Sequence, residues 1–294
     1  MIVPQQESFN QQIDFENLYK IELYIKREDV LHDEISGNKF RKLKYNLEEA
    51  KRLGHTKLLT FGGAYSNHIA AVAAAGRDFG FETIGIIRGE ELAEKYLENL
   101  TLKKASENGM QFYFVTRTQY RDKTNPDFLA ELNQQFGNFY LIPEGGTNEL
   151  AVKGCEEILT EEDKMFDFIC CAVGTGGTIS GIINSLKPHQ KALGFPALKG
   201  DFLFDEIQKY AKNDQWDLIT DYHFGGYAKV NDELKSFIFS FTDKHSIPLE
   251  PIYTGKMLFG ITELINKGYF PKNSKILAVH TGGLQGFQYK KACG

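Results

Sequence analysis

A lysine at the start of an amphipathic helix is the residue of this chain best suited to covalent chemistry. The segment Gly37-Asn38-Lys39 is followed by apolar residues at three- and four-residue spacing. Glycine and asparagine tolerate turn conformations, so the helix is expected to begin beside Lys39. The positive pole of the helix dipole and the cations that follow both disfavour an ammonium there. We therefore predict a lowered pKa for Lys39, whose neutral amine can attack an aldehyde. Lys42, one turn later, is the alternative.

A run of small residues is the second feature that could do chemistry. Gly174-Thr175-Gly176-Gly177-Thr178 stands between an apolar run and a predicted helix. Backbone N–H groups at a helix start are a site for phosphate. A dinucleotide fingerprint would need glycine at 179, where Ile179 stands, and an acidic residue about 20 positions later. A nucleotide-binding loop with a Gly-Lys-Ser or Gly-Lys-Thr ending is also excluded.

One cofactor explains both features. Pyridoxal phosphate has an aldehyde that would take Lys39 and a phosphate that would take loop 174–178. Two other classes stay open from these residues: a binder of pyridoxal phosphate or nucleotide without turnover, and a nicotinamide-dependent dehydrogenase.

The elements that must position these residues alternate between strand and helix periods. Strands are expected at 21–26, 57–61, 83–87, 112–115, 139–142, 166–173, 192–195, 216–219 and 275–280. Helices are expected at 39–53, 68–79, 92–108, 126–136, 148–159, 178–186, 202–211, 232–245 and 256–267. This alternation predicts an α/β fold with two open, mostly parallel twisted sheets and helices on both faces. We expect a large cofactor-binding domain of residues 1–44 and 149–294 and a small α/β domain of residues 45–148.

Composition points to a small-molecule partner. The 294 residues carry a net charge of −5, which argues against a nucleic-acid surface, and no apolar run is long enough to span a bilayer. No leader pattern is recognisable, so we expect a cytoplasmic protein. Cys155, Cys170, Cys171 and Cys293 form no C-x-x-C pair, and we interpret them as buried thiols with no metal or disulfide role.

The order of the motifs resembles a known family. The motifs are Ile25-Lys26-Arg27-Glu28-Asp29, Ser36-Gly37-Asn38-Lys39-x-Arg41-Lys42-Leu43, Gly63-Ala64-Tyr65-Ser66-Asn67-His68, loop 174–178, Pro251-Ile252-Tyr253-Thr254-Gly255-Lys256 and His280-Thr281-Gly282-Gly283. Together they resemble the pyridoxal-phosphate enzymes of the tryptophan-synthase β fold. Within that fold they resemble the branch of 1-aminocyclopropane-1-carboxylate deaminase and D-cysteine desulfhydrase.

The resemblance implies a role for each matching cofactor residue. Lys39 would bond covalently to the cofactor, Asn67 would meet its 3′ oxygen, and loop 174–178 would hold its phosphate. Tyr253 would lie beside the pyridine ring, with Thr254 near the ring nitrogen.

The same resemblance implies the substrate site. Ser66, Asn67 and His68 would bind the substrate carboxylate at the start of a helix. Tyr227 resembles the second active-site tyrosine of the family. The expected catalytic set is therefore Lys39, Ser66, Tyr227 and Tyr253, in a small-molecule enzyme expected to be a homodimer.

The residue at position 254 guides the choice of substrate. The deaminase pattern has glutamate there, which keeps the ring nitrogen protonated, whereas this chain has Thr254. A hydroxyl supplies no charge, which suits a good leaving group such as sulfide. We expect α,β-elimination from a D-cysteine-like amino acid, with 1-aminocyclopropane-1-carboxylate deamination as the alternative.

Overall fold

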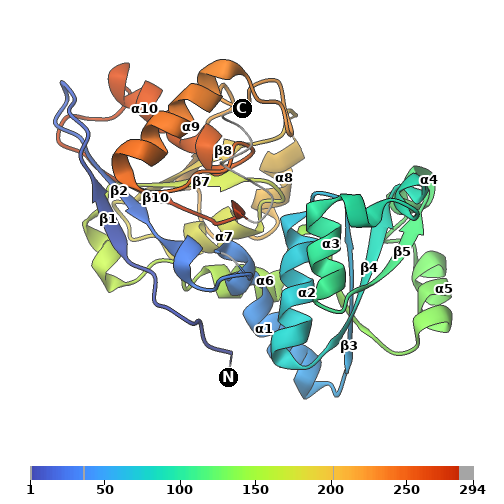
Figure 1. Ribbon diagram of the computed structural model, residues 1–294. Coiled ribbons are helices and arrows are strands. Elements are labelled where there is room, and N and C mark those ends of the chain that lie inside the picture. Colours follow the sequence, from blue (N-terminus) through green and yellow to red (C-terminus); the bar gives the residue numbers. More distant parts are fainter. Residues whose placement is uncertain (1, 36, 201, 285–294) are drawn as a thin grey trace.

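The computed structural model describes residues 2–35, 37–200 and 202–284, and their strands form two sheets (Figure 1). The larger sheet has the order β1 (Asn10–Ile13), β2 (Glu22–Lys26), β10 (Lys275–Val279), β7 (Phe168–Val173), β8 (Lys191–Pro196) and β9 (Trp216–Leu218). The smaller sheet has the order β5 (Gln111–Val115), β4 (Glu82–Arg88), β3 (Lys57–Gly62) and β6 (Tyr140–Ile142). All pairings of described strands are parallel except that between β1 and β2. The predicted α/β class with two open, mostly parallel sheets is confirmed.

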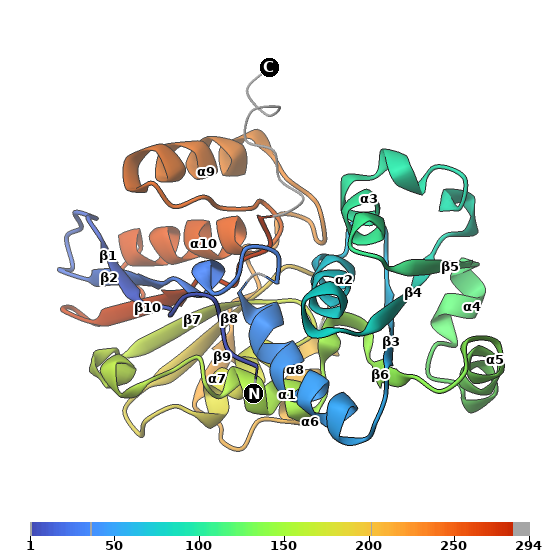
Figure 2. The same cartoon turned by 60° about the horizontal axis from the view of Figure 1, so that its bottom comes forward.

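Helices cover both faces of the larger sheet. α9 (Asp232–His245) and α10 (Thr254–Asn266) pack on one face, and α7 (Gly177–Asn184) and α8 (Phe202–Gln208) on the other (Figure 2). Cys170 belongs to the core under α10 and Cys171 to the core under α7. The adjacent thiols therefore face opposite ways, as the alternation of a strand requires. Cys155, Cys170 and Cys171 are buried, as predicted, and Cys293 lies outside the described residues.

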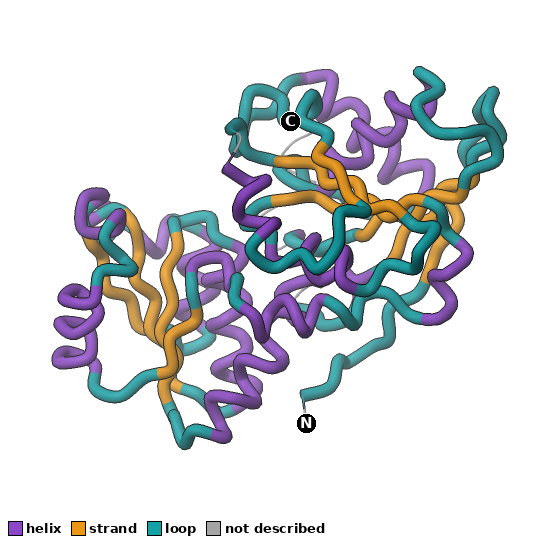
Figure 3. The backbone as a smooth tube through the Cα atoms, turned by 180° about the vertical axis from the view of Figure 1, so that it is seen from behind, coloured by secondary structure: helices purple, strands orange, loops and turns teal. Residues whose placement is uncertain are grey.

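The smaller sheet is covered in the same way. α2 (Asn67–Phe79) and α3 (Leu100–Glu107) pack on one face, and α4 (Arg117–Arg121) and α5 (Pro126–Phe136) on the other (Figure 1). From behind, the two sheets are distinct groups of strands with helices between them (Figure 3). α1 (Asn38–Arg52) leads from the larger sheet to the smaller, and α6 (Glu149–Cys155) leads back. No helix in the described ranges is long and apolar enough to cross a membrane.

The single helix predicted over residues 92–108 is wrong. The chain there forms two 3-10 turns, η2 (Glu90–Leu92) and η3 (Tyr96–Glu98), before α3 begins. Asn99 is extended, and its side chain accepts the N–H of Leu102 at 3.0 Å. Asparagine at this position starts a new helix because its side-chain oxygen satisfies a backbone donor that has no partner in the helix. The structure also contains β1, α4 and the 3-10 turns η1 (Glu28–Val30), η4 (Glu144–Gly146) and η5 (Glu161–Met165), which the periodicity did not predict.

A glycine brings the start of α1 against the end of β10. Gly37 has φ of +58°, and a Cβ at this position would lie 2.1 Å from the carbonyl oxygen of Thr281. Both observations exclude a side chain, since the backbone conformation is left-handed and the neighbour is main chain. Lys39 lies in the first turn of α1, as predicted.

A second close approach joins α1 to α6. A Cβ at Gly154 would lie 2.0 Å from the carbonyl oxygen of Arg41, so the two backbones touch. Because α1 carries Lys39, the crossing of these two helices decides where Lys39 lies.

We predict that Gly154→Ala lowers the free energy of unfolding by about 2–3 kcal/mol, because the added methyl group must push the two helices apart. Chemical denaturation measures this loss. Gly109→Ala is the control: Gly109 has φ of +88° but open space around it, so its loss should be about 1 kcal/mol. An equal loss in the two variants would contradict the close approach.

Candidate functional site

Three loops meet the first turns of α1. The backbone N–H of Asn38 donates to the carbonyl of Thr281 at 3.3 Å, and its side-chain amide donates to the hydroxyl of Thr178 at 2.8 Å. Lys42 Nζ donates to the carbonyl of Gly145 at 2.9 Å. These loops follow β10, β7 and β6, so the contacts gather the carboxyl ends of strands from both sheets. In open α/β folds this edge is where ligands bind.

Lys39 lies in the first turn of α1, where these loops meet, and its pKa is lowered. The residue is half-buried, and its Nζ donates to Asn38 Oδ1 at 3.0 Å. Burial and then the charge of Lys42 lower the pKa of Lys39 to about 7. The direction agrees with the sequence-based prediction, although burial is the larger cause. About half of such amines are neutral at pH 7, so Lys39 can act as a nucleophile and as a base.

Lys42 is a buried cation that faces only neutral oxygens. Its side chain is 3% exposed, and Nζ contacts the hydroxyls of Thr147 at 3.0 Å and Thr175 at 3.3 Å as well as Gly145. Within the described ranges no carboxylate forms an ion pair with it. Burial lowers the pKa of Lys42 as well. A buried charge without a counter-ion is costly, so this corner is suited to a bound anion.

The loop 174–178 surrounds the same corner. Gly176 has φ of +82° and precedes α7, whose first N–H groups have no partner inside the helix. A Cβ at Gly177 would lie 2.8 Å from Thr147 Oγ1, so the loop leaves no room for side chains there. Thr147 and Thr175 share a hydroxyl contact of 2.6 Å. Backbone donors, two hydroxyls and one lysine thus converge, as a phosphate site requires.

Ser66 and Asn67 stand at the start of α2. Ser66 is the N-cap residue, and its hydroxyl accepts the N–H of Ile69 at 3.3 Å. The side chain of Asn67 lies close to Gly283 in the loop after β10. A Cβ added at Gly283 would be 2.8 Å from the side-chain nitrogen of Asn67. The N-terminus of α2 therefore points into the region that also holds Gly283.

His68 is more buried than a solvated helix start would allow. Its Nε2 lies 2.8 Å from the hydroxyl of Thr60, and its Nδ1 has no hydrogen-bond partner among the described residues. Burial, followed by the charges of Lys39 and Lys42, lowers the pKa of His68 well below its ordinary value. The ring is therefore neutral at physiological pH. Its predicted contact with a substrate carboxylate stays a prediction.

Two tyrosines, Tyr253 and Tyr227, lie beside loop 174–178. A Cβ at Gly174 would lie 3.1 Å from the ring of Tyr253, so this ring rests on the loop. Tyr227 stands edge-on to Tyr253, with the ring centroids 6.3 Å apart and the planes at 64°. Burial raises the pKa of both phenols. Both therefore keep their protons at neutral pH and can donate hydrogen bonds.

Thr254 is bound to a carboxylate that the sequence did not reveal. Its side chain is fully buried, and its hydroxyl donates to Glu250 Oε1 at 3.1 Å. The same carboxylate, 3% exposed, accepts the backbone N–H groups of Ile252, Tyr253 and Thr254 at 2.7, 2.8 and 2.6 Å. Burial raises the pKa of Glu250, whereas these four donors oppose the rise. An acidic residue just before a predicted helix was the available signal.

Close contacts link several of the predicted residues at the carboxyl ends of the strands. Lys42 contacts Thr175 of loop 174–178, Asn67 lies against Gly283, and the ring of Tyr253 lies against Gly174. Lys256 on α10, a residue of a quoted motif without an assigned role, also bonds to the Tyr227 loop.

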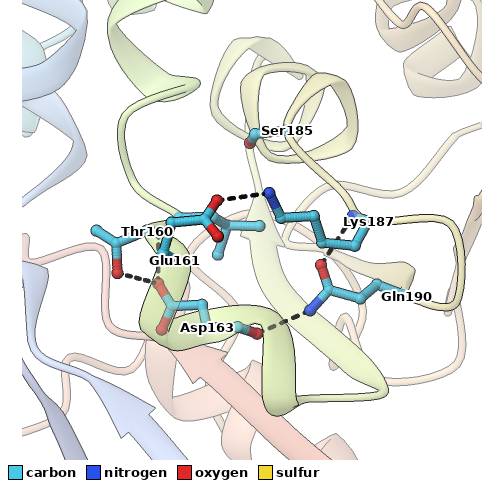
Figure 4. A pocket seen from close by; sticks show the side chains of 7 residues that line it. Thr160, Glu161, Asp163, Ser185, Lys187 and Gln190 are labelled. Atoms are coloured by element: carbon cyan, nitrogen blue, oxygen red, sulfur yellow. Dashed lines mark hydrogen bonds and ion pairs between the residues drawn. The ribbon is translucent and has the colours of Figure 1, made fainter.

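A cavity of about 440 Å³ lies elsewhere, between η5 and the end of α7 (Figure 4). Its polar groups already have partners: Glu161 pairs with Lys187 at 2.7 Å, and Asp163 accepts the N–H of Thr160 at 2.7 Å. None of the predicted site residues lines it. We assign it no ligand.

We predict that acylation of Lys39 in cofactor-free protein rises with pH through a midpoint near 7 and levels off above it, because only the neutral amine reacts. Acetic anhydride labelling followed by mass spectrometry of the Lys39 peptide measures this profile. In Lys42→Met the midpoint should move to higher pH, because a neighbouring positive charge is lost. A wild-type midpoint near 10, as in an ordinary lysine, would contradict the lowered pKa.

Comparison with known proteins agrees with this geometry. The family model described as "Pyridoxal-phosphate dependent enzyme" matches residues 11–282. A protein of Pyrococcus horikoshii, provisionally named 1-aminocyclopropane-1-carboxylate deaminase, is 33% identical over 91% of this chain and 86% of its own. The bifunctional D-cysteine desulfhydrase/1-aminocyclopropane-1-carboxylate deaminase of Arabidopsis thaliana is 29% identical, over 92% of this chain and 74% of its own.

A solved structure extends the match to three dimensions. The crystal structure of an ACC deaminase homologue has a TM-score of 0.81 and 28% identity, and the match covers 99% of this chain and 94% of that one. The family indicated by the lysines, the glycine loop and the sheet order is therefore also indicated by relatives that match most of the chain. The chain belongs to the pyridoxal-phosphate-dependent enzymes, in the family of 1-aminocyclopropane-1-carboxylate deaminase and D-cysteine desulfhydrase.

Proposed function

We propose that this enzyme is a deaminating lyase that eliminates sulfide from D-cysteine or a closely similar amino acid. With one water molecule, D-cysteine yields pyruvate, ammonia and hydrogen sulfide. The observation that carries the lyase assignment is Lys39, a lysine with a pKa of about 7 beside a buried cation without a counter-ion.

The residues of the site fit the cofactor. Lys39 has the neutral amine that the cofactor's aldehyde requires, and Lys42 with loop 174–178 has the charge and donors that its phosphate requires. Asn67 is proposed for the 3′ oxygen, Tyr253 for the face of the ring and Thr254 for the ring nitrogen. Bound pyridoxal phosphate supplies an electron-withdrawing ring that stabilises negative charge at the substrate's α-carbon.

The chain's own groups then divide the remaining work. Ser66, Asn67 and His68, at the positive end of α2, would hold the substrate carboxylate. Lys39 Nζ, largely neutral above pH 7, would take the α-proton. Tyr253 and Tyr227, whose raised pKa values keep them protonated, would donate hydrogen bonds toward the departing group.

The choice of substrate rests on Thr254 and its partner. A hydroxyl at position 254 supplies no charge, which favours release of a good leaving group. Glu250 is the observation that favours the second candidate, deamination of 1-aminocyclopropane-1-carboxylate, because it puts a carboxylate one hydrogen bond behind that hydroxyl. A negative charge near the ring nitrogen would strengthen the electron demand that ring opening needs.

We further propose that residues 1–44 and 149–294 form the cofactor-binding domain and residues 45–148 the small domain. The smaller sheet supports this division, because its strands all lie within residues 57–142. Cytoplasmic location and a homodimer stay predictions.

The substrate prediction is sulfide release from D-cysteine and no 2-oxobutanoate from 1-aminocyclopropane-1-carboxylate. Both products are measured with purified holoenzyme. Lys39→Ala should lose turnover, whereas Lys44→Ala, on the same helix but paired with Glu157, should retain it. Formation of 2-oxobutanoate would favour the second candidate, and no product from either amino acid would refute both.

A separate prediction concerns Lys42 and the cofactor phosphate. Lys42→Met should weaken binding of pyridoxal phosphate by about tenfold or more relative to pyridoxal, which has no phosphate, because a charge-assisted hydrogen bond is lost. The change in the pKa of Lys39 affects both aldehydes alike. Titration followed by absorbance measures both affinities, with Lys44→Met as the matched control. Equal weakening for the two ligands would show that Lys42 does not meet the phosphate.

A further inference from the structure

We propose that Lys256 is the positioning residue of Tyr227, so that a buried lysine on α10 controls one of the two active-site tyrosines. This inference rests on the proposed function only in taking Tyr227 as an active-site residue. No covalent step is involved: the lysine acts on the backbone that carries the tyrosine.

The contacts of Lys256 are with main chain on both sides of one turn. Its Nζ donates to the carbonyl of His223 at 2.9 Å and to that of Gly226 at 2.9 Å, and the side chain is 2% exposed. Among the described residues, no carboxylate lies within ion-pair distance of it. Burying an ammonium on two neutral carbonyls carries a desolvation cost that an apolar residue would avoid. We infer that this cost is offset by the function of the turn, which must stay in one position to place Tyr227.

The turn combines local hydrogen bonds with a strained backbone. The N–H of Gly226 donates to the carbonyl of His223 at 3.0 Å, and the N–H of Gly225 donates to the His223 ring at 2.9 Å. Phe224, Gly225, Gly226 and Ala228 all have positive φ, at 55°, 90°, 116° and 57°. Left-handed conformations cost about 1 kcal/mol or more each at the two residues with side chains. Lys256 bonds the carbonyls at the two ends of the segment that contains three of these four residues. The ring of Phe224 adds an edge-on contact with Phe259 of α10, with centroids 5.0 Å apart.

Tyr227 follows this turn directly. The residue is 44% exposed, so burial fixes the position of its ring only in part. The ring nevertheless stands edge-on to Tyr253, which rests on Gly174 of the phosphate loop. A line of contacts therefore runs from that loop through both tyrosines to the turn and Lys256. Glu250 holds the backbone of Tyr253 at the same end of α10, so one helix start sets both rings.

A double-mutant cycle tests the proposal with holoenzyme. Lys256→Met should lower kcat/KM by about tenfold when Tyr227 is present, and by less than about twofold in the Tyr227→Phe background, because the lysine acts by placing the Tyr227 hydroxyl, which that background lacks. Lys256→Gln, which keeps a shorter donor, serves if Lys256→Met does not fold, and should give a smaller loss of the same kind. Equal losses in the two backgrounds would overturn the proposal and leave Lys256 a stabiliser of the fold alone.

A second readout needs neither substrate nor turnover. In protein labelled with 3-fluorotyrosine, the fluorine NMR signal that disappears in Tyr227→Phe belongs to Tyr227. This signal should shift in Lys256→Met and stay in place in Lys26→Met. Lys26 is the control because it is also a buried lysine, but it pairs with Asp163 and not with the turn. An unmoved Tyr227 signal in Lys256→Met overturns the proposal. Failure of D-cysteine as a substrate, with the expected fluorine shift, would refute the proposed substrate and leave the role of Lys256 standing.

Discussion

Two lysines one turn apart on α1 share a buried corner in which Lys42 has only neutral oxygens as partners. The charge of Lys42 is not cancelled by a described carboxylate, so it acts on its neighbour and adds to the burial that lowers the pKa of Lys39. A bound phosphate would balance that charge. The same arrangement therefore prepares a nucleophile and an anion site, and each depends on the other through Coulomb repulsion between two ammonium groups.

Close backbone contacts make this corner possible. Lys39 is held against the loop after β10 because Gly37 has no side chain, and α1 lies on α6 because Gly154 has none. These contacts join segments of both sheets around one helix start. A shift of α1 by the width of a methyl group would move the lysines relative to loop 174–178, and the hydrogen bonds of Lys42, at 2.9–3.3 Å, would not survive it.

Two buried residues of opposite charge, Glu250 and Lys256, hold the backbone at Tyr253 and at the turn before Tyr227. Glu250 accepts the N–H groups of Ile252, Tyr253 and Thr254 at the start of α10, where the helix dipole favours an anion. Lys256, one turn further, bonds carbonyls of the Tyr227 turn. Burial lowers the pKa of Lys256, and the charge of Glu250 opposes that effect. Two buried charged residues thus fix the backbone of a segment whose aromatic rings face the glycine loop. Thr254 itself supplies no charge, unlike a glutamate at that position, but its hydroxyl is bonded to the carboxylate of Glu250.

Local features of the chain were determined by the sequence alone. The turn before Lys39 and the alternation of strands and helices rest on neighbouring residues, so periodicity and turn chemistry predicted them. The break at Asn99 was missed because one capping side chain overrode an apolar pattern. Only the tertiary structure decided the environments of Lys42, His68, Glu250 and Lys256. Lys42 meets a carbonyl 103 positions away and Lys256 one 33 positions away. Charge, burial and pKa at such places depend on what the fold brings near, and no spacing within one segment carries that information.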